Sequence, residues 1–239
     1  MEQRKKANVQ AKVHAVRFKP ENRIQIILDN VYCKGEGFEQ VLPGMTVWTW
    51  QDPPMIPAPG QNVKAFLRMK PIDGFDNFHA WNSRDYWSRQ GIIHRSFTKG
   101  DTDPPVRITG QPGFLWKWRL KLRFKILEAT KPGPGQGLLL ALLMADRSQL
   151  EYRTLDLVNR ASLTHSLALS GLHLGFIISL GWAAAWGIGR FWPRIFLVLP
   201  RPMVAIILGI PLVIAYLWLG QGRDSLLLAA LMFFFWVLL

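Results

Sequence analysis

The last third of the chain carries almost no charge, which restricts what it can fold into. Residues 163–239 contain one acidic and four basic residues, and these separate three apolar runs. Helices on the surface of a soluble protein carry one apolar stripe and not an apolar circumference. Three such runs within 77 residues leave too little polar surface for a buried hairpin in water. The region therefore predicts membrane helices.

The three runs differ in length, and a membrane-spanning helix needs about 20 residues. The first, 167–189, is long enough. The second, 203–219, has 17 residues and contains Pro211, which membrane helices tolerate when neighbouring helices satisfy the freed backbone groups. The third, 226–239, has 14 residues and is expected to be a helix cut short. We predict a truncated transmembrane domain of about three helices at 163–239, in a sequence that looks incomplete at both ends.

Basic residues in the loop between the first two runs predict the topology. Arg190, Arg194 and Arg201 lie there, and short cytoplasmic loops are enriched in Lys and Arg. This places the preceding domain outside the cell membrane. Residues 1–40, however, contain no apolar signal segment that would carry a basic domain across. Either the natural chain begins earlier with further helices, or the loop rule is overridden.

The first half of the chain is basic and polar. Residues 1–127 carry 21 Lys and Arg against 11 Asp and Glu, a net charge of +10, whereas residues 128–239 carry 8 against 5, a net charge of +3. β-favouring stretches separated by Pro and Gly predict a small β domain at 1–112, with an OB-like five-stranded barrel as one candidate. The fold class is thus β plus transmembrane α. The stretches are 9–13, 23–28, 45–50 and 61–68.

Tryptophans in this β domain have two interpretations. Trp48 and Trp50 lie on the same side of an alternating strand, which favours the core. Trp81, Tyr86 and Trp87 lie in a segment rich in Arg, Asn and Ser, and basic surfaces with aromatic platforms hold single-stranded nucleic acid. The positive charge also fits anionic lipid or simple solubility.

Several kinds of chemistry have no sequence signal. The single Cys33 excludes an intramolecular disulfide, and its expected role is that of an ordinary strand residue. The sequence has no Gly-rich phosphate loop and no Cys/His cluster with zinc spacing. We therefore expect no metal, no cofactor and no ATP-driven motor within this chain.

A connector at 113–162 joins the two halves. From 117 to 125 every odd position is basic and every even position is apolar. A period of two predicts a strand or an interface-bound ribbon, because on a helix these charges would spread around the circumference. The favoured partner is a membrane surface with anionic headgroups, and DNA phosphate is the alternative. The Gly/Pro segment 133–137 has the composition of a linker.

Two histidines stand near the start of the first apolar run. His165 and His173 are eight residues apart, about 12 Å on a helix, which is too far for both to bind one zinc ion. Ser170 and His173 share a helix face, as a nucleophile and its base would, but no third orienting group is evident, so we expect no enzyme. Gly171 and Gly175 permit close helix contact. The favoured interpretation is helix packing plus a polar lining within the membrane.

Two motifs resemble the competence domain of the ComEC family, bacterial inner-membrane channels for DNA uptake. Residues 142–148 read Leu-Leu-Met-Ala-Asp-Arg-Ser, and residues 165–173 read His-Ser-Leu-Ala-Leu-Ser-Gly-Leu-His. The family typically has Leu-Gly-Asp-Arg and His-Leu-Leu-Ala-Ile-Ser-Gly-Leu-His. The first half is similar to that family's OB-fold domain at 70–78 and 86–92. Departures from the family pattern are Ala145 in place of Gly, Ala161-Ser162 in place of Thr-Gly, and Leu227 or Leu228 where an Arg is expected.

This resemblance implies that one DNA strand crosses the bacterial inner membrane along a polar path in a multi-pass protein with an extracytoplasmic β domain. Asp146 is expected to orient Arg147, which would neutralise a phosphate at the mouth of the path; alternatively, the two residues cap and pair near a helix end. By position, the DNA-path candidates are Arg147, His165, Ser170 and His173, with motif support from Asp146, Gly171 and Gly175.

The resemblance also implies partners. The family's leading membrane helices, most of its helical bundle and its metallo-β-lactamase-like nuclease domain have no counterpart in this sequence. Two or three helices do not enclose a strand-sized pore unless copies of the chain assemble. Expected partners are single-stranded DNA, the membrane, the remainder of the channel, a DNA receptor protein and a motor ATPase. The alternative is a non-transporting, membrane-anchored β domain that binds nucleic acid or an envelope polymer.

Overall fold

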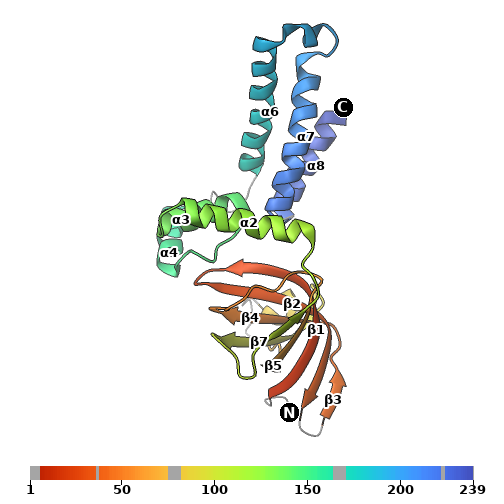
Figure 1. Ribbon diagram of the computed structural model, residues 1–239, viewed down its shortest axis with the longest axis vertical. Helices are drawn as coiled ribbons and strands as arrows, with labels where there is room; N and C mark the ends of the chain where they lie inside the picture. The colour runs from red at the N-terminus through yellow and green to blue at the C-terminus, as the bar shows by residue number, and fades with distance from the viewer. Residues whose placement is uncertain (1–5, 36–37, 75–81, 164–170, 222–223, 239) are drawn as a thin grey trace. The chain divides into compact units, whose positions relative to one another are not determined.

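The chain forms two compact units in a computed structural model that describes residues 6–35, 38–74, 82–163, 171–221 and 224–238. The first unit consists of Met1–Gly133 together with Arg147–Tyr152, and the second of Pro134–Asp146 together with Arg153–Leu239. The chain thus enters the second unit after Gly133, returns to the first for six residues and then leaves it again. Figure 1 follows this order from the β-strands to the long helices.

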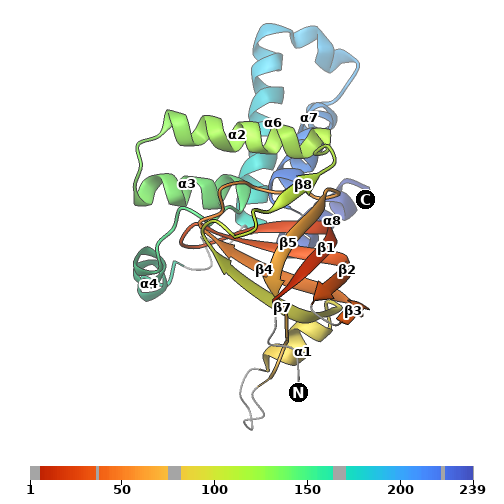
Figure 2. The ribbon, with the colours of Figure 1, turned by 60° about the horizontal axis from the view of Figure 1, so that its bottom comes forward.

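The first unit is built on one mixed sheet of eight strands (Figure 2). The hydrogen-bonded order is β6-β7-β4-β2-β1-β5-β8, and β3 pairs with β2 off this path. Among the described pairs, β4 and β7 are parallel and the others are antiparallel. The strands are β1 (Lys6–Lys19), β2 (Arg23–Gly35), β3 (Phe38–Val41), β4 (Met45–Gln51), β5 (Asn62–Arg68), β6 (Lys70–Pro71), β7 (Ile92–Lys99) and β8 (Arg107–Thr109).

The predicted β structure of the N-terminal part is confirmed, and the four predicted stretches fall on β1, β2, β4 and β5. The predicted OB-like barrel is not confirmed, because the sheet does not close. β5 and β7 come near each other, but each already has a short strand on its outer edge. β8 pairs with β5 and β6 pairs with β7, so those edges are occupied among the described residues.

The core of this unit contains the tryptophan pair that the sequence places there. Trp48 and Trp50 are fully buried, with ring centroids 4.8 Å apart. Their indole nitrogens donate to Thr98 Oγ1 and to the Gly100 carbonyl, each at 2.8 Å. Buried indoles need such acceptors. The two tryptophans therefore fill the core and also link β4 to β7 and the residue after it. The expected strand position of Cys33 is also confirmed, since it lies buried in β2.

The second aromatic group is only partly described. Tyr86 and Trp87 lie on the short helix α1 (Ser83–Ser88) and meet edge to face at 5.1 Å. Tyr86 is exposed and Trp87 is half-buried. Trp81 lies outside the described residues. The predicted role of this group in binding nucleic acid stays a prediction.

The predicted strand at 116–126 is wrong: these residues belong to helix α2 (Phe114–Ala129). Its buried residues are Trp116, Arg119 and Arg123, which share one helix face at spacings of three and four. Trp116 stacks on Phe18 of β1, with ring centroids 6.4 Å apart and planes within 4°.

The period of two misled because basic residues need not form one stripe on a helix. In α2 the lysines 117, 121 and 125 form one exposed row, whereas Arg119 and Arg123 face the β domain. The Arg123 guanidinium lies 4.9 Å from the Phe18 ring centroid. A delocalised, weakly hydrated guanidinium stacks on aromatic faces, so an arginine can take a core-facing position that a lysine would not.

The second unit is helical. Two of its described helices, α6 (Gly171–Phe191) and α7 (Arg201–Leu219), are long and apolar enough to cross a membrane, over residues 172–191 and 201–219. They lie side by side (Figures 1 and 2). The other elements are α3 (Pro134–Met144), α4 (Tyr152–Arg160), the 3₁₀ helix η1 (Pro193–Leu197) and α8 (Asp224–Leu238).

Contact between α6 and α7 depends on small residues. A Cβ atom added to Gly181 would lie 3.0 Å from the Ala205 carbonyl oxygen and 3.0 Å from Gly209 Cα. A Cβ atom added to Gly175 would meet nothing within 4 Å. The close helix approach therefore lies at Gly181 and not at Gly175. α7 continues through Pro211, as expected for a proline within a membrane helix.

Candidate functional site

The Asp-Arg-Ser motif begins where α3 ends. Ala145 follows the helix with a φ of 56°, in the left-handed region. Its N–H donates to the Ala141 carbonyl at 3.1 Å, and the N–H of buried Asp146 donates to the Leu140 carbonyl at 3.3 Å. Glycine is the usual residue at such a helix end, because it has no Cβ to clash. This conformation accounts physically for the glycine that the ComEC family has at the position of Ala145.

The second departure from the family pattern has the same geometry. α4 ends in a Schellman motif, in which Ser162 N–H donates to the Asn159 carbonyl and Leu163 N–H donates to the Val158 carbonyl, both at 2.9 Å. Ser162 has a φ of 57° and stands where the family has glycine. Both substitutions thus place a side chain in a backbone conformation that favours glycine.

After Asp146 the chain docks on the β1–β2 turn of the first unit. Glu21 and Asn22 of that turn have φ values of 59° and 49°. Their N–H groups donate to the carbonyls of Leu150 at 3.0 Å and Ser148 at 2.8 Å. Leu150 is 1% exposed, so the docked segment also contributes to the core. We call this arrangement the clamp: Arg147–Tyr152, the turn of residues 20–22, Arg23 and Arg123.

Arg123 ties the clamp to α2. Its Nη2 donates to Ser148 Oγ at 3.0 Å, and both residues are buried. The same guanidinium lies over Phe18 at 4.9 Å and near the Phe124 ring at 5.8 Å. One cation thus joins β1, α2 and the motif segment, and a hydrogen bond to a charged donor is stronger than a neutral one.

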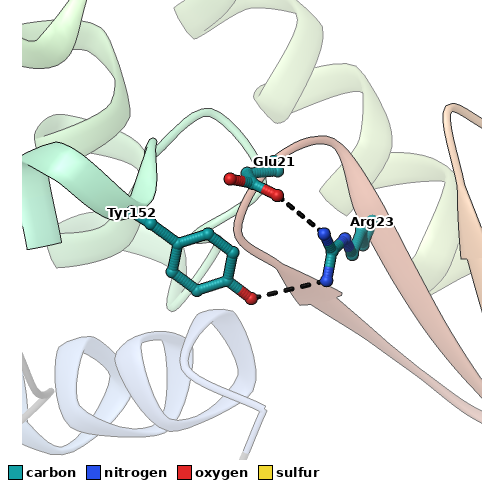
Figure 3. Close-up of polar contacts among 3 residues, drawn as sticks. All are labelled: Glu21, Arg23 and Tyr152. Carbon is teal, nitrogen blue, oxygen red and sulfur yellow. Dashed lines mark hydrogen bonds and ion pairs between the residues drawn. The ribbon is translucent and has the colours of Figure 1, made fainter.

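A second arginine holds the outer edge of the clamp (Figure 3). Arg23 Nη2 donates to Glu21 Oε2 at 2.7 Å, and Arg23 Nη1 donates to Tyr152 Oη at 3.5 Å. Its guanidinium also lies 5.7 Å from the Tyr152 ring centroid. These groups are partly exposed, so each contact contributes little to stability. Together they hold Tyr152 beside Arg23.

Beside the clamp lies a pocket of about 400 Å³. This volume is within the range of small-molecule sites. Its walls are mostly apolar, and three polar side chains open onto it. The polar residues are Asn22, Arg123 and Gln149; the apolar ones are Phe18, Ile24, Pro53, Pro54, Met55, Ile56, Leu120 and Phe124.

The structure describes two of the four DNA-path candidates. Arg147 is half-buried in the first unit, and this burial lowers the pKa of its guanidinium, although an arginine stays charged. His173 is half-buried on α6 in the second unit. His165 and Ser170 lie outside the described residues. The predicted polar lining and the predicted effect of Asp146 on Arg147 stay predictions.

Several clamp residues could not be identified from the sequence. Arg123 is one of five evenly spaced basic residues in α2, and Ser148 follows the Asp-Arg pair without a signal of its own. Asn22 contributes through its backbone N–H, which every residue type except proline has. Positive φ at an Asn within a Pro-Glu-Asn turn was a detectable signal, because Asn tolerates the left-handed region. No group of three His, Cys, Asp or Glu suited to a metal ion occurs among the residues that the structure describes.

Comparisons with known proteins match both parts of the chain. Residues 142–239 match the family model described as competence protein. The chain is 30% identical over 165 residues to recombination protein 2 of Haemophilus influenzae. This match covers 69% of the chain and 20% of the relative, so the chain spans about a fifth of that protein. No solved structure matches.

Proposed function

Because residues 142–239 of this chain belong to the competence protein family, known as ComEC, we propose that the chain is a component of a bacterial inner-membrane channel that imports single-stranded DNA during natural transformation. The family itself suggests a role in DNA uptake. The observation that carries the proposal is that the family match includes both the motif segment in the clamp and the two candidate membrane helices.

The membrane part of the proposal depends on α6 and α7. Two helices do not surround a DNA strand, so the channel would need further helices beside α6 and α7. The loop with Arg190, Arg194 and Arg201 would face the cytoplasm under the positive-inside rule. That orientation makes the β domain extracytoplasmic, where it would meet incoming DNA.

The DNA path would use polar groups that an apolar helix otherwise excludes. His173 is one described example, since polar side chains in membrane segments usually face a bundle interior or a water-filled path. His165 and Ser170 belong to the same motif by position. Arg147 would meet phosphate where the strand enters, since cationic side chains neutralise backbone phosphates.

The β domain would hold the strand before it enters. It is basic, and basic surfaces with aromatic platforms hold single-stranded nucleic acid. The pocket beside the clamp offers apolar walls, the Phe124 ring and the Arg123 guanidinium to a nucleobase. Stacking on such surfaces tolerates any sequence, as uptake of arbitrary DNA requires.

The test replaces the two described path residues at the chromosomal locus, so that any natural partners are present. We expect His173→Ala and Arg147→Ala to abolish the appearance of labelled DNA in a nuclease-protected compartment, with normal amounts of protein in the membrane. The matched controls are Leu172→Ala, beside His173 and 77% exposed, and Arg153→Ala, an exposed arginine. Normal uptake by both site variants would contradict a lined path.

A second assay separates this proposal from the alternative of a non-transporting β domain anchored in the membrane. The chain is expressed alone in a strain that lacks the natural gene. Protected DNA indicates that copies of the chain assemble into a channel. Surface-bound DNA that remains nuclease-sensitive, with the site variants at the locus unaffected, supports a binding module instead.

A further inference from the structure

The outer face of α2 carries two parallel rows of side chains. Phe114, Trp118 and Leu122 form an apolar row, and the lysines 117, 121 and 125 form a basic row. Residues four apart stand one above the other on a helix. The protein leaves the apolar row uncovered, with exposed fractions of 70%, 51% and 37%. Leu115, 60% exposed, widens it.

These side chains form an ordered cluster. The Phe114 and Trp118 rings meet edge to face, with centroids 5.9 Å apart. Lys121 Nζ lies 5.2 Å from the Trp118 ring centroid. The indole therefore lies between the apolar row and the basic row, with contacts to both.

The fold prevents this face from turning inward. On the opposite side of α2, Trp116 stacks on Phe18 and Arg123 donates to Ser148. Rotating the helix to bury Trp118 would break both contacts and expose a buried guanidinium. The exposed rows are thus held outward by the clamp.

We propose that this outer face lies on the surface of a bilayer containing anionic lipids, with the apolar row at the headgroup–acyl boundary and the lysine row on lipid phosphates. Interfacial helices combine Trp, Phe and Leu on one face with Lys beside it, and Trp is enriched at membrane interfaces. The charge complements such a surface, because Glu128 is the sole acidic residue of α2.

Two further observations favour lipid over nucleic acid. DNA would engage the lysines and leave Phe114 and Leu122 in water, whereas a bilayer boundary covers both rows. The same chain also continues into two helices long and apolar enough to span a membrane. The inference concerns attachment to the membrane and does not depend on DNA transport.

The experiment uses the full chain in vesicles, with an environment-sensitive nitrobenzoxadiazole label on Trp118→Cys. The background is Cys33→Ser, although Cys33 is buried and its burial raises the thiol pKa to about 11. The matched control is Val41→Cys on β3, an apolar residue 65% exposed in the same unit. We expect blue-shifted emission and quenching by spin-labelled lipid at position 118 in vesicles of phosphatidylcholine and phosphatidylglycerol, and a water-like signal at position 41.

Removing the lysine row provides the second arm. Each basic residue near an anionic surface raises the affinity by a factor of about five. The triple variant Lys117→Gln, Lys121→Gln and Lys125→Gln is therefore expected to lower the ratio of surface-bound to unbound helix on the order of a hundredfold. Vesicles of phosphatidylcholine alone should have a similar effect. A Leu122→Cys label repeats the measurement if the Trp118 variant misfolds.

Three outcomes would overturn the proposal. Equal quenching of positions 118 and 41 by aqueous iodide would place the face in water. Shielding from iodide without quenching by spin-labelled lipid would mean that protein covers it. A spectral change that appears only when single-stranded oligonucleotide is added would identify a nucleic-acid surface.

Discussion

Replacing Arg123 with Met is predicted to release the motif segment from the β domain. The guanidinium lies over the Phe18 ring and donates to Ser148 Oγ at 3.0 Å, with both partners of that hydrogen bond buried. A desolvated cation–π contact contributes about 2 kcal/mol, and a hydrogen bond from a charged group about 1.5–3 kcal/mol. Methionine recovers part of the packing, so we expect a net loss of about 2–4 kcal/mol.

The assay is hydrogen–deuterium exchange of the full chain, read from the peptide that contains the β1–β2 turn. The amides of Glu21 and Asn22 donate to the docked segment and exchange only when it lifts. Since 1.4 kcal/mol is a factor of ten, these amides should exchange roughly 30- to 700-fold faster in the Arg123→Met variant. The control is Lys121→Met on the exposed face of the same helix, for which the change should stay within about 0.5 kcal/mol.

A double-mutant cycle with Ser148→Ala tests the mechanism. If the hydrogen bond couples the two residues, Arg123→Met should have a smaller effect once Ser148 Oγ is gone, by about 1.5–3 kcal/mol. Unchanged exchange at the turn in Arg123→Met, with α2 still folded, would refute the conclusion that the buried guanidinium holds the segment down.

Three further predictions concern other parts of the chain. Ser162→Gly should stabilise the end of α4 by about 0.5–1 kcal/mol. The left-handed conformation costs a residue with a side chain about 1–2 kcal/mol, and the greater conformational entropy of glycine in the unfolded chain offsets part of the gain. Slower amide exchange at residues 161–163 would confirm the prediction, and unchanged exchange would contradict it. Gly181→Ala should weaken α6–α7 packing by about 1–3 kcal/mol, because the added Cβ would meet backbone atoms at 3.0 Å. The measurement is resistance to unfolding in a detergent titration. The control is Gly175→Ala, where an added Cβ meets nothing within 4 Å. Burial lowers the pKa of His94 below its usual 6.5. The unfolded chain therefore binds more protons than the folded chain, and the β domain should lose stability as the pH falls from about 6.5. In His94→Gln the denaturant midpoints at pH 7 and pH 5 should converge, and an equal pH dependence in both proteins would exclude His94 as the cause.

Strands with ordinary alternation were predictable, and a strand with inverted alternation was not. β1 and β5 place apolar residues inward and polar residues outward. β2 and β4 were found by their concentration of β-favouring residues, although they also bury Gln25 and Thr46. β7 does the opposite over part of its length: His94 and Ser96 are buried, whereas Ile93 and Phe97 are 44% and 58% exposed. A pattern search that expects polar residues outside has no reason to select it.

The two candidate membrane helices and the clamp show the same contrast at the candidate site. Length and composition were enough to predict α6 and α7, because a bilayer imposes both. The clamp is made largely of backbone donors on one turn and backbone acceptors 126–129 residues later, which carry no side-chain signature. The motif residues predicted Arg147 as part of a site, but the importance of Arg123 appeared only in three dimensions.

The path of the chain through the clamp limits how this protein can be dissected. Because Arg147–Tyr152 belongs to the β unit although Pro134–Asp146 does not, no single cut separates the two units cleanly. A fragment ending at Gly133 would leave the turn amides and the Arg123 guanidinium without the acceptors they have in the intact chain. A graft of the β domain between relatives must therefore extend through Tyr152 and include α3, although α3 belongs to the second unit.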